Sequence, residues 1–138
     1  MRIRTSSQSR RERGTTAVEL ALMIPLITML VVGCIDLGRG VWAKHSLEHV
    51  VGDAVRWAAV NGDSSSSPMT EATMETRVRS ALPYLDSEEL TVTTTWSPNN
   101  RPGSDVTVNL SYNFDPIIPF MSMEAFALSA AATSVISY

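Results

Sequence analysis

The sequence contains very little cysteine, since Cys34 is the only one among 138 residues. An intrachain disulfide is therefore impossible, and any folded domain must be held together by packing alone. Basic residues are also few, and the arginines near the N-terminus have no aromatic residues interleaved with them. We expect no nucleic-acid partner, because basic surfaces that bind single strands combine positive charge with stacking aromatics.

Charge is distributed unevenly along the chain. The formal net charge is -3, yet residues 1–14 carry +4, from five arginines against Glu12, so the remainder carries -7. A short basic segment before an apolar run is typical of the cytoplasmic flank of a membrane segment, because arginine-rich flanks stay inside. We therefore expect a cytoplasmic N-terminus and a C-terminal part on the outer side of the membrane.

One long apolar run follows the basic segment. Residues 15–35 carry a single charge, Glu19, and as a helix they would be about 31 Å long, close to a hydrocarbon core of roughly 30 Å. We expect this segment to span the membrane, with a kink at Pro25, where one backbone hydrogen bond is lost. Even lenient insertion scales give roughly 2.5–3.5 kcal/mol for a charge in lipid. The carboxylate of Glu19 therefore requires a specific reason.

Beyond residue 35 the pattern is that of an amphipathic helix, which predicts one long helix that continues to residue 62. Apolar residues recur there at helical spacing, with charged residues largely opposite, and Asn61-Gly62 predicts the end. A second helix is expected, with Pro68 in its first turn. Its buried stripe is expected to consist of Met74, Val78, Ala81, Leu82 and Leu85.

The remaining sequence favours β-strands. TVTTTW from Thr91 is rich in β-formers, SPNNRPGS is typical of a turn, and VTVNLSYNF alternates strictly, so these segments predict a hairpin. Alternate residues from Phe126 to Ile136 share a face, which predicts a last strand, although FALSAAAT is also compatible with a helix on propensity. The expected fold class is α+β: a long N-terminal helix, transmembrane and then amphipathic, packed against a small antiparallel sheet with one additional helix.

The junction between the basic segment and the apolar run has a recognisable form. Gly14 is followed by Thr15, and Glu19 stands five residues after the glycine. This arrangement resembles the prepilin signal of type IV pilins, in which a membrane aspartic peptidase cuts after the glycine. The longer string AVELALMIPLITMLVVGCIDLGR resembles the start of TadE-like minor pilins of the bacterial tight-adherence (Tad, type IVb) pilus system. In that family a proline in the apolar segment, here Pro25, and an Asp-x-Gly-Arg end, here residues 36–39, recur.

The resemblance implies a structural role and no enzymatic activity. The protein would be a minor pilin, or pseudopilin, that helps to assemble or initiate a pilus used in adherence, and it would need no cofactor. Its partners would be the prepilin peptidase, other pilins and Tad pilus components, and membrane lipid. The expected parts are a leader (1–14), a transmembrane segment (15–35), an amphipathic continuation (36–62) and a small α+β head (63–138) outside the cytoplasmic membrane.

The resemblance also gives Gly14 and Glu19 physical roles. A peptidase requires an extended chain at the bond that it cuts, and Gly14 removes side-chain bulk there. Cleavage would free an amine at Thr15, one turn before Glu19. The carboxylate would pair with such an amine, expected on a neighbouring subunit, so that neither charge is left alone in lipid.

Two short motifs allow other functions. VVGC, ending at Cys34, fits a bacterial lipobox and would make the product a lipoprotein lipidated at Cys34. HSLEH formally satisfies the H-x-x-E-H pattern of inverted zinc metallopeptidases, with His45 and His49 as ligands and Glu48 as base. The context argues against both motifs. Lipidation at Cys34 would remove the pilin-like segment, and a zinc metallopeptidase would need a further ligand, a substrate cleft and a longer chain. We therefore expect no metal site.

Overall fold

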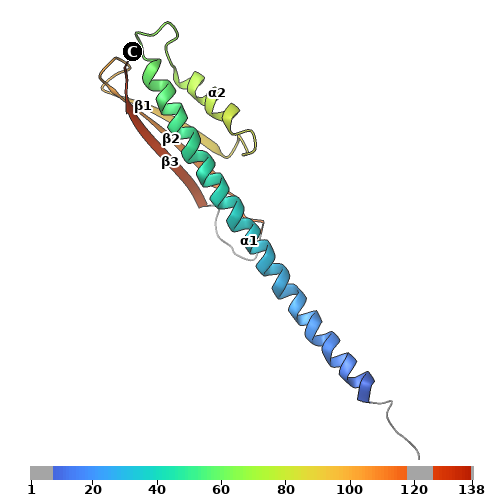
Figure 1. Cartoon of the computed structure of the whole chain (residues 1–138). Helices are drawn as coiled ribbons and strands as arrows, with labels where there is room; N and C mark the ends of the chain where they lie inside the picture. The colour runs from blue at the N-terminus through green and yellow to red at the C-terminus, as the bar shows by residue number, and fades with distance from the viewer. Residues whose placement is uncertain (1–7, 118–125, 138) are drawn as a thin grey trace, which may run out of the picture.

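A single long helix dominates the molecule. The computed structural model describes residues 8–117 and 126–137, with side chains from residue 16 onward. Helix α1 runs from Gln8 to Val60, 53 residues and about 80 Å at roughly 1.5 Å per residue, and only its C-terminal part touches the remainder of the protein (Figure 1). The predicted continuity past residue 35 is confirmed. The helix begins inside the basic segment and continues through Pro25.

The other elements form a small head along the C-terminal part of α1. Helix α2 (Glu71–Ala81) is followed by strands β1 (Leu90–Ser97), β2 (Asp105–Phe114) and β3 (Phe126–Val135). The strands form one antiparallel sheet in the order β1-β2-β3, with Trp96 opposite Val106 and Leu110 opposite Ala130. The predicted α+β layout is therefore confirmed. The segment FALSAAAT is a strand, not the helix that propensity also allowed.

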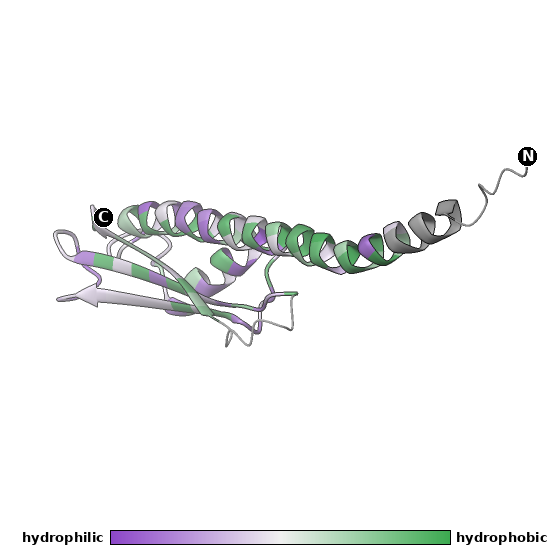
Figure 2. Cartoon of the chain, turned by 90° about the horizontal axis from the view of Figure 1, so that it is seen from below, coloured by the Kyte–Doolittle hydropathy of each residue, from purple (hydrophilic) through white to green (hydrophobic). Residues whose placement is uncertain are grey.

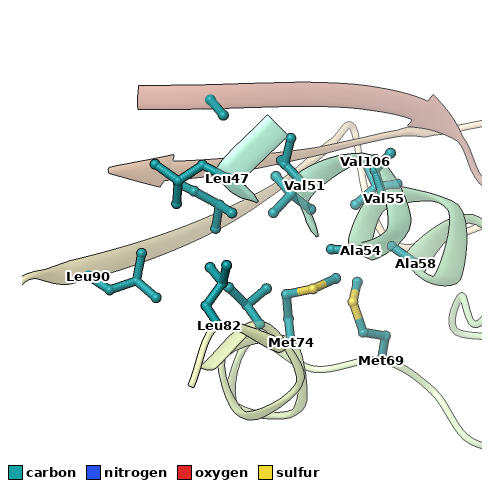
Figure 3. Packing of buried hydrophobic residues seen from close by; sticks show 14 of the residues in the cluster. Leu47, Val51, Ala54, Val55, Ala58, Met69, Met74, Leu82, Leu90 and Val106 are labelled. Carbon is teal, nitrogen blue, oxygen red and sulfur yellow. The ribbon is translucent and has the colours of Figure 1, made fainter. Parts of the chain in front are cut away.

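Strict alternation in the sequence fixes which face of the sheet is buried. Val106, Val108 and Leu110 of β2 are buried, while the residues between them point to the other, polar face. Figure 3 shows Leu47 and Val51 of α1 packed toward the sheet, with Met74 of α2 closing the core from the other side. The largest side chains that are almost completely inaccessible to solvent are Leu47, Met74, Val78, Val106, Val108, Leu110 and Ile136.

Helix α1 and strand β3 lie side by side and run in the same direction. Near one end of the contact, Lys44 Nζ donates a hydrogen bond to the carbonyl oxygen of Ser129. At the other end, the Ser137 amide donates to the carbonyl oxygen of Ala59 at 2.7 Å. The helical span between Lys44 and Ala59 is about 22 Å and the strand span between Ser129 and Ser137 is about 27 Å. These lengths nearly match, so the two axes are close to parallel.

Helix α2 begins later than the position of Pro68 predicts. The N-cap is Thr70, whose hydroxyl accepts from the Thr73 amide at 3.3 Å while the Thr73 hydroxyl accepts from the Thr70 amide at 2.9 Å. This reciprocal cap places Pro68 outside the helix, so that prediction is wrong. Of the expected stripe, Met74, Val78 and Leu82 are buried and Leu85 is half-buried, whereas Ala81 is exposed.

Truncation of Leu47 should test the core. The side chain is 0% exposed at the centre of the cluster, so Leu47→Ala should lower the free energy of unfolding by about 2–5 kcal/mol. Leu22→Ala is the matched control, because Leu22 lies on the same helix but is 73% exposed. Denaturant unfolding in detergent, followed by near-UV circular dichroism of the head, measures both. Equal losses would contradict the described core.

Candidate functional site

The N-terminal half of α1 has an apolar surface with no partner in this chain. All residues from 16 to 31 are exposed, and none of the most apolar window of the helix is buried. Figure 2 shows this hydrophobic stretch clear of the head. Burying one large apolar side chain is worth about 1.5–3 kcal/mol, so this much exposed apolar surface favours lipid or other apolar helices over water. One N-terminal helix of this kind supports anchoring in a membrane.

Glu19 is the one charged residue within the apolar stretch, 16–35. Its side chain is exposed on the helix surface, between Val18 (61% exposed) and Leu20 (62% exposed). Among the side chains that the structure describes, no ion pair with Glu19 is seen. Its pairing with an amine of a neighbouring subunit stays a prediction.

The backbone of Gly14 and Thr15 is helical. Both residues lie inside α1, which begins at Gln8. Proteases bind their substrates as extended chains, so cutting between these residues requires the first turns of α1 to unwind locally. A glycine in a helix interior costs about 0.5–1 kcal/mol relative to alanine, which makes unwinding easier at this position.

Pro25 and Thr28 alter the hydrogen bonding of the apolar stretch. Pro25 has no amide hydrogen, so the carbonyl one turn earlier loses its helical donor. The Thr28 hydroxyl donates to the carbonyl oxygen of Ile24 at 2.8 Å. This bond satisfies the hydroxyl of Thr28 without solvent. The kink at Pro25 stays a prediction.

The Asp-x-Gly-Arg sequence lies where α1 enters the head. Arg39 Nη1 donates to Asp36 Oδ1 at 2.8 Å, and the Asp36 side chain is only 9% exposed. The Arg39 guanidinium also lies over the ring of Phe114, 5.2 Å from its centroid. One turn of α1 therefore carries an ion pair, and the arginine of this pair also contacts the end of β2.

Gly40 faces the ring of Phe114 at this junction. A Cβ atom built on Gly40 would lie 3.9 Å from the ring of Phe114, an ordinary contact distance. The sequence indicated that Phe114 faces inward, by alternation along its strand. It did not indicate that Arg39 would be its partner, because no local pattern relates the two residues.

The candidate functional residues of the two alternative motifs lie on the surface of α1. Cys34 is an exposed residue within continuous helix α1. The two histidines of HSLEH are also exposed, and each lies beside a carboxylate of the same helix: His45 Nδ1 is 3.4 Å from Glu48 and His49 Nδ1 is 3.5 Å from Asp53. In the part of the chain that the structure describes, no group of three or more His, Cys, Asp or Glu residues is placed to hold a metal.

The comparison with protein families bears on this same stretch of helix. Residues 14–56 match the family model described as TadE-like protein. The resemblance read from the sequence is thereby confirmed. The TadE-like segment begins at Gly14, includes Glu19, Pro25 and the Arg39 junction, and ends in the part of α1 that packs in the core. Comparisons with curated proteins and with solved structures give no significant match.

The TadE-like segment therefore combines the apolar half of α1 with its attachment to the head. This match supports a protein associated with the Tad pilus. It also suggests a structural rather than an enzymatic protein. The head beyond residue 56 lies outside the match, so its role has to be inferred from its own surface.

Replacing Arg39 should loosen the junction. Arg39→Met removes the cation beside nearly buried Asp36, and should lower the free energy of unfolding by about 1–2 kcal/mol, a value reduced because the arginine side chain is 45% exposed. Arg39→Lys keeps the charge but loses the planar group over Phe114, so an intermediate loss is expected.

The matched control for this test is Arg56→Met. Arg56 is 82% exposed and 3.8 Å from Asp53, so its removal should change the free energy of unfolding by less than about 0.5 kcal/mol. Denaturant titration of the detergent-solubilised protein measures all three variants. Indistinguishable values for Arg39→Met and Arg56→Met would show that the junction contributes nothing beyond a surface ion pair.

Proposed function

We propose that this protein is a minor pilin, or pseudopilin, of a Tad-type (type IVb) pilus used in adherence. The observation that carries the proposal is the match of residues 14–56 to the TadE-like family, over a helix whose apolar half has no partner in its own chain. Such a helix can lie in a membrane before assembly and then pack against the helices of other subunits. The role is assembly or initiation of the filament, and it requires no catalytic residue or cofactor.

Processing is the first step of this function. A prepilin peptidase would recognise the basic leader (1–14) and cut between Gly14 and Thr15. Because both residues lie within α1, the peptidase would have to bind a locally unwound chain. Cleavage would leave a charged amine at Thr15, at the start of the apolar helix.

Pairing of this new amine with Glu19 is the second step. A carboxylate and an ammonium in a low-dielectric environment each carry a large desolvation cost, and that cost is offset when they meet. Thr15 and Glu19 are four residues apart, one helical turn, so the amine of an adjacent subunit can reach Glu19 when two helices lie side by side with a small axial offset. The pair would set the register between subunits.

The remaining parts follow from this arrangement. The transmembrane segment (15–35) would supply the lateral contacts, the amphipathic continuation (36–62) would form the spine of the head, and the α+β head (63–138) would lie outside the cytoplasmic membrane. Other pilins and Tad assembly components would contact the head and the apolar helix. Membrane lipid would surround that helix before assembly.

Intact-mass measurement tests the processing step. Protein purified from membranes that contain the cognate prepilin peptidase should begin at Thr15, and protein from membranes without it should keep residues 1–14. Gly14→Trp should remain uncut, because the indole would clash where the backbone enters the peptidase. Thr16→Trp is the control, since it adds the same bulk beyond the new N-terminus. A diacylated product that begins at Cys34 would refute the pilin assignment.

The charge pairing is tested by Glu19→Gln. This variant should be cut normally but should reach sheared pili at least about tenfold less than wild type, because an ammonium left unpaired in lipid costs more than about 1.4 kcal/mol. Glu88→Gln is the control, since Glu88 is an exposed carboxylate of the head. Quantitative immunoblots of pilus and membrane fractions give the ratio. Assembly of Glu19→Gln at the wild-type level would show that the pairing is not needed.

A further inference from the structure

The exposed apolar side chains of the head are concentrated at one end. From residue 37 onward, eight large apolar side chains are exposed in the part of the chain that the structure describes. Only Val60 and Val135 lie at the far end, where α1 and β3 terminate. The six others lie near the place where α1 enters the head, and together we name them the aromatic collar: Leu37, Val41, Trp42, Tyr84, Ile117 and Phe126.

The collar surrounds α1 from two sides at one level. On the α2 side, the rings of Trp42 and Tyr84 lie edge to face, 6.0 Å apart, beside a shallow groove of about 330 Å³ between α1 and the end of α2. On the sheet side, the ring of Phe126 lies 5.4 Å from that of Phe114, which itself is at the level of Gly40. Tyr84 is 80% exposed, so these contacts leave most of its ring free.

The height of the collar matches a membrane interface. The hydrocarbon core of a bilayer is about 30 Å thick and the whole bilayer about 40–45 Å, which leaves about 5–8 Å of interface on each side. If residues 15–35 occupy the core, the Cα atom of Trp42 lies about 10 Å beyond its edge. Helical side chains point back toward the N-terminus, so the indole reaches into the interface. Tryptophan and tyrosine are the residues enriched at that depth.

We propose that the aromatic collar is a lipid-contacting surface that seats the head on the bilayer interface. This inference rests on α1 spanning the membrane, and it goes beyond the pilin role by assigning a resting position to the head. The collar continues the apolar surface of α1 without interruption, since Leu37 is 73% exposed and Val41 is 57% exposed on the same helix. Before assembly the head therefore stands upright on the membrane, with α2 and the sheet at fixed height.

The charged side chains near the aromatic collar determine whether electrostatic attraction to lipid headgroups contributes to binding. Asp86, Glu88, Glu89 and Asp115 are exposed at the same end, and the amide of Asn113 donates to the Glu89 carbonyl at 3.1 Å, which places Glu89 beside the end of β2. These carboxylates outweigh the cations Arg39 and Lys44, whose side chains are 45% and 39% exposed, and therefore disfavour anionic headgroups. The collar must therefore bind through its apolar and aromatic groups, and zwitterionic lipid suffices.

The full chain in nanodiscs of zwitterionic phosphatidylcholine provides the test. The three tryptophans are the probes, and lipids brominated on the upper acyl chain are the quencher. Wild type should show a quenchable component of about a third of its emission, Trp42→Phe should abolish it, and Trp57→Phe should retain it. Trp57 lies about 22 Å further along α1, beyond the reach of a short-range quencher, and is the matched control.

Cys34 separates this proposal from membrane anchoring itself. A fluorophore attached to this single, exposed cysteine reports insertion of α1 through the same quencher. Quenching at Cys34 together with loss of the tryptophan component in Trp42→Phe supports the collar.

Three outcomes would overturn the collar. Quenching at Cys34 with equal tryptophan emission in plain and brominated lipid would leave anchoring intact, with the collar free for protein contact. Absence of quenching at Cys34 would remove the membrane premise as well. Tryptophan quenching that appears only with anionic lipid and disappears in high salt would show contact through Arg39 and Lys44 instead.

Discussion

The structure depends on one constraint: the helix that is available to a membrane is also the helix around which the head is built. In α1 the same backbone hydrogen-bond ladder passes from exposed Val18 to buried Leu47 without a loop between them. A loop would let the two halves turn independently. A continuous helix does not, so the rotation and depth of the apolar half determine which way the sheet and α2 face.

The junction at residues 36–40 shows how this coupling is held. Where a helix leaves a packed domain, the turn at the boundary has neighbours on few sides and can bend. In α1 this turn is held by the Asp36–Arg39 ion pair and by the contact of Arg39 with the ring of Phe114. Gly40 faces the same ring, so the end of β2 lies against the helix at this turn. The Asp-x-Gly-Arg sequence thus joins the exposed apolar half of α1 to the packed head. This is a physical reason for its place in the TadE-like segment.

Local patterns in the sequence carried much of this fold. Periodicity predicted the continuity of α1, and strict alternation predicted which residues of β2 and β3 face the core, because both depend on neighbours a few positions away. The start of α2 was misjudged, since Pro68 suits a first turn but the Thr70–Thr73 cap fixes the boundary. Contacts between distant segments, such as Arg39 with Phe114 and Trp42 with Tyr84, leave no periodic signal. Gly14 and Glu19 could be proposed as site residues because they lie close in sequence, and their roles stay predictions. The collar could not be proposed in this way, because it comes from four separate segments.

The parallel course of α1 and β3 determines how the head responds to a force along the helix axis. A force along the helix axis does not peel the sheet away one residue at a time, because helix and strand slide past each other in shear. The bonds from Lys44 to Ser129 and from Ser137 to Ala59, near the two ends of the contact, are then strained together with the core between them. Shear loading of this kind spreads a pull over the whole contact, so the head is built to resist traction along the same axis by which it is attached.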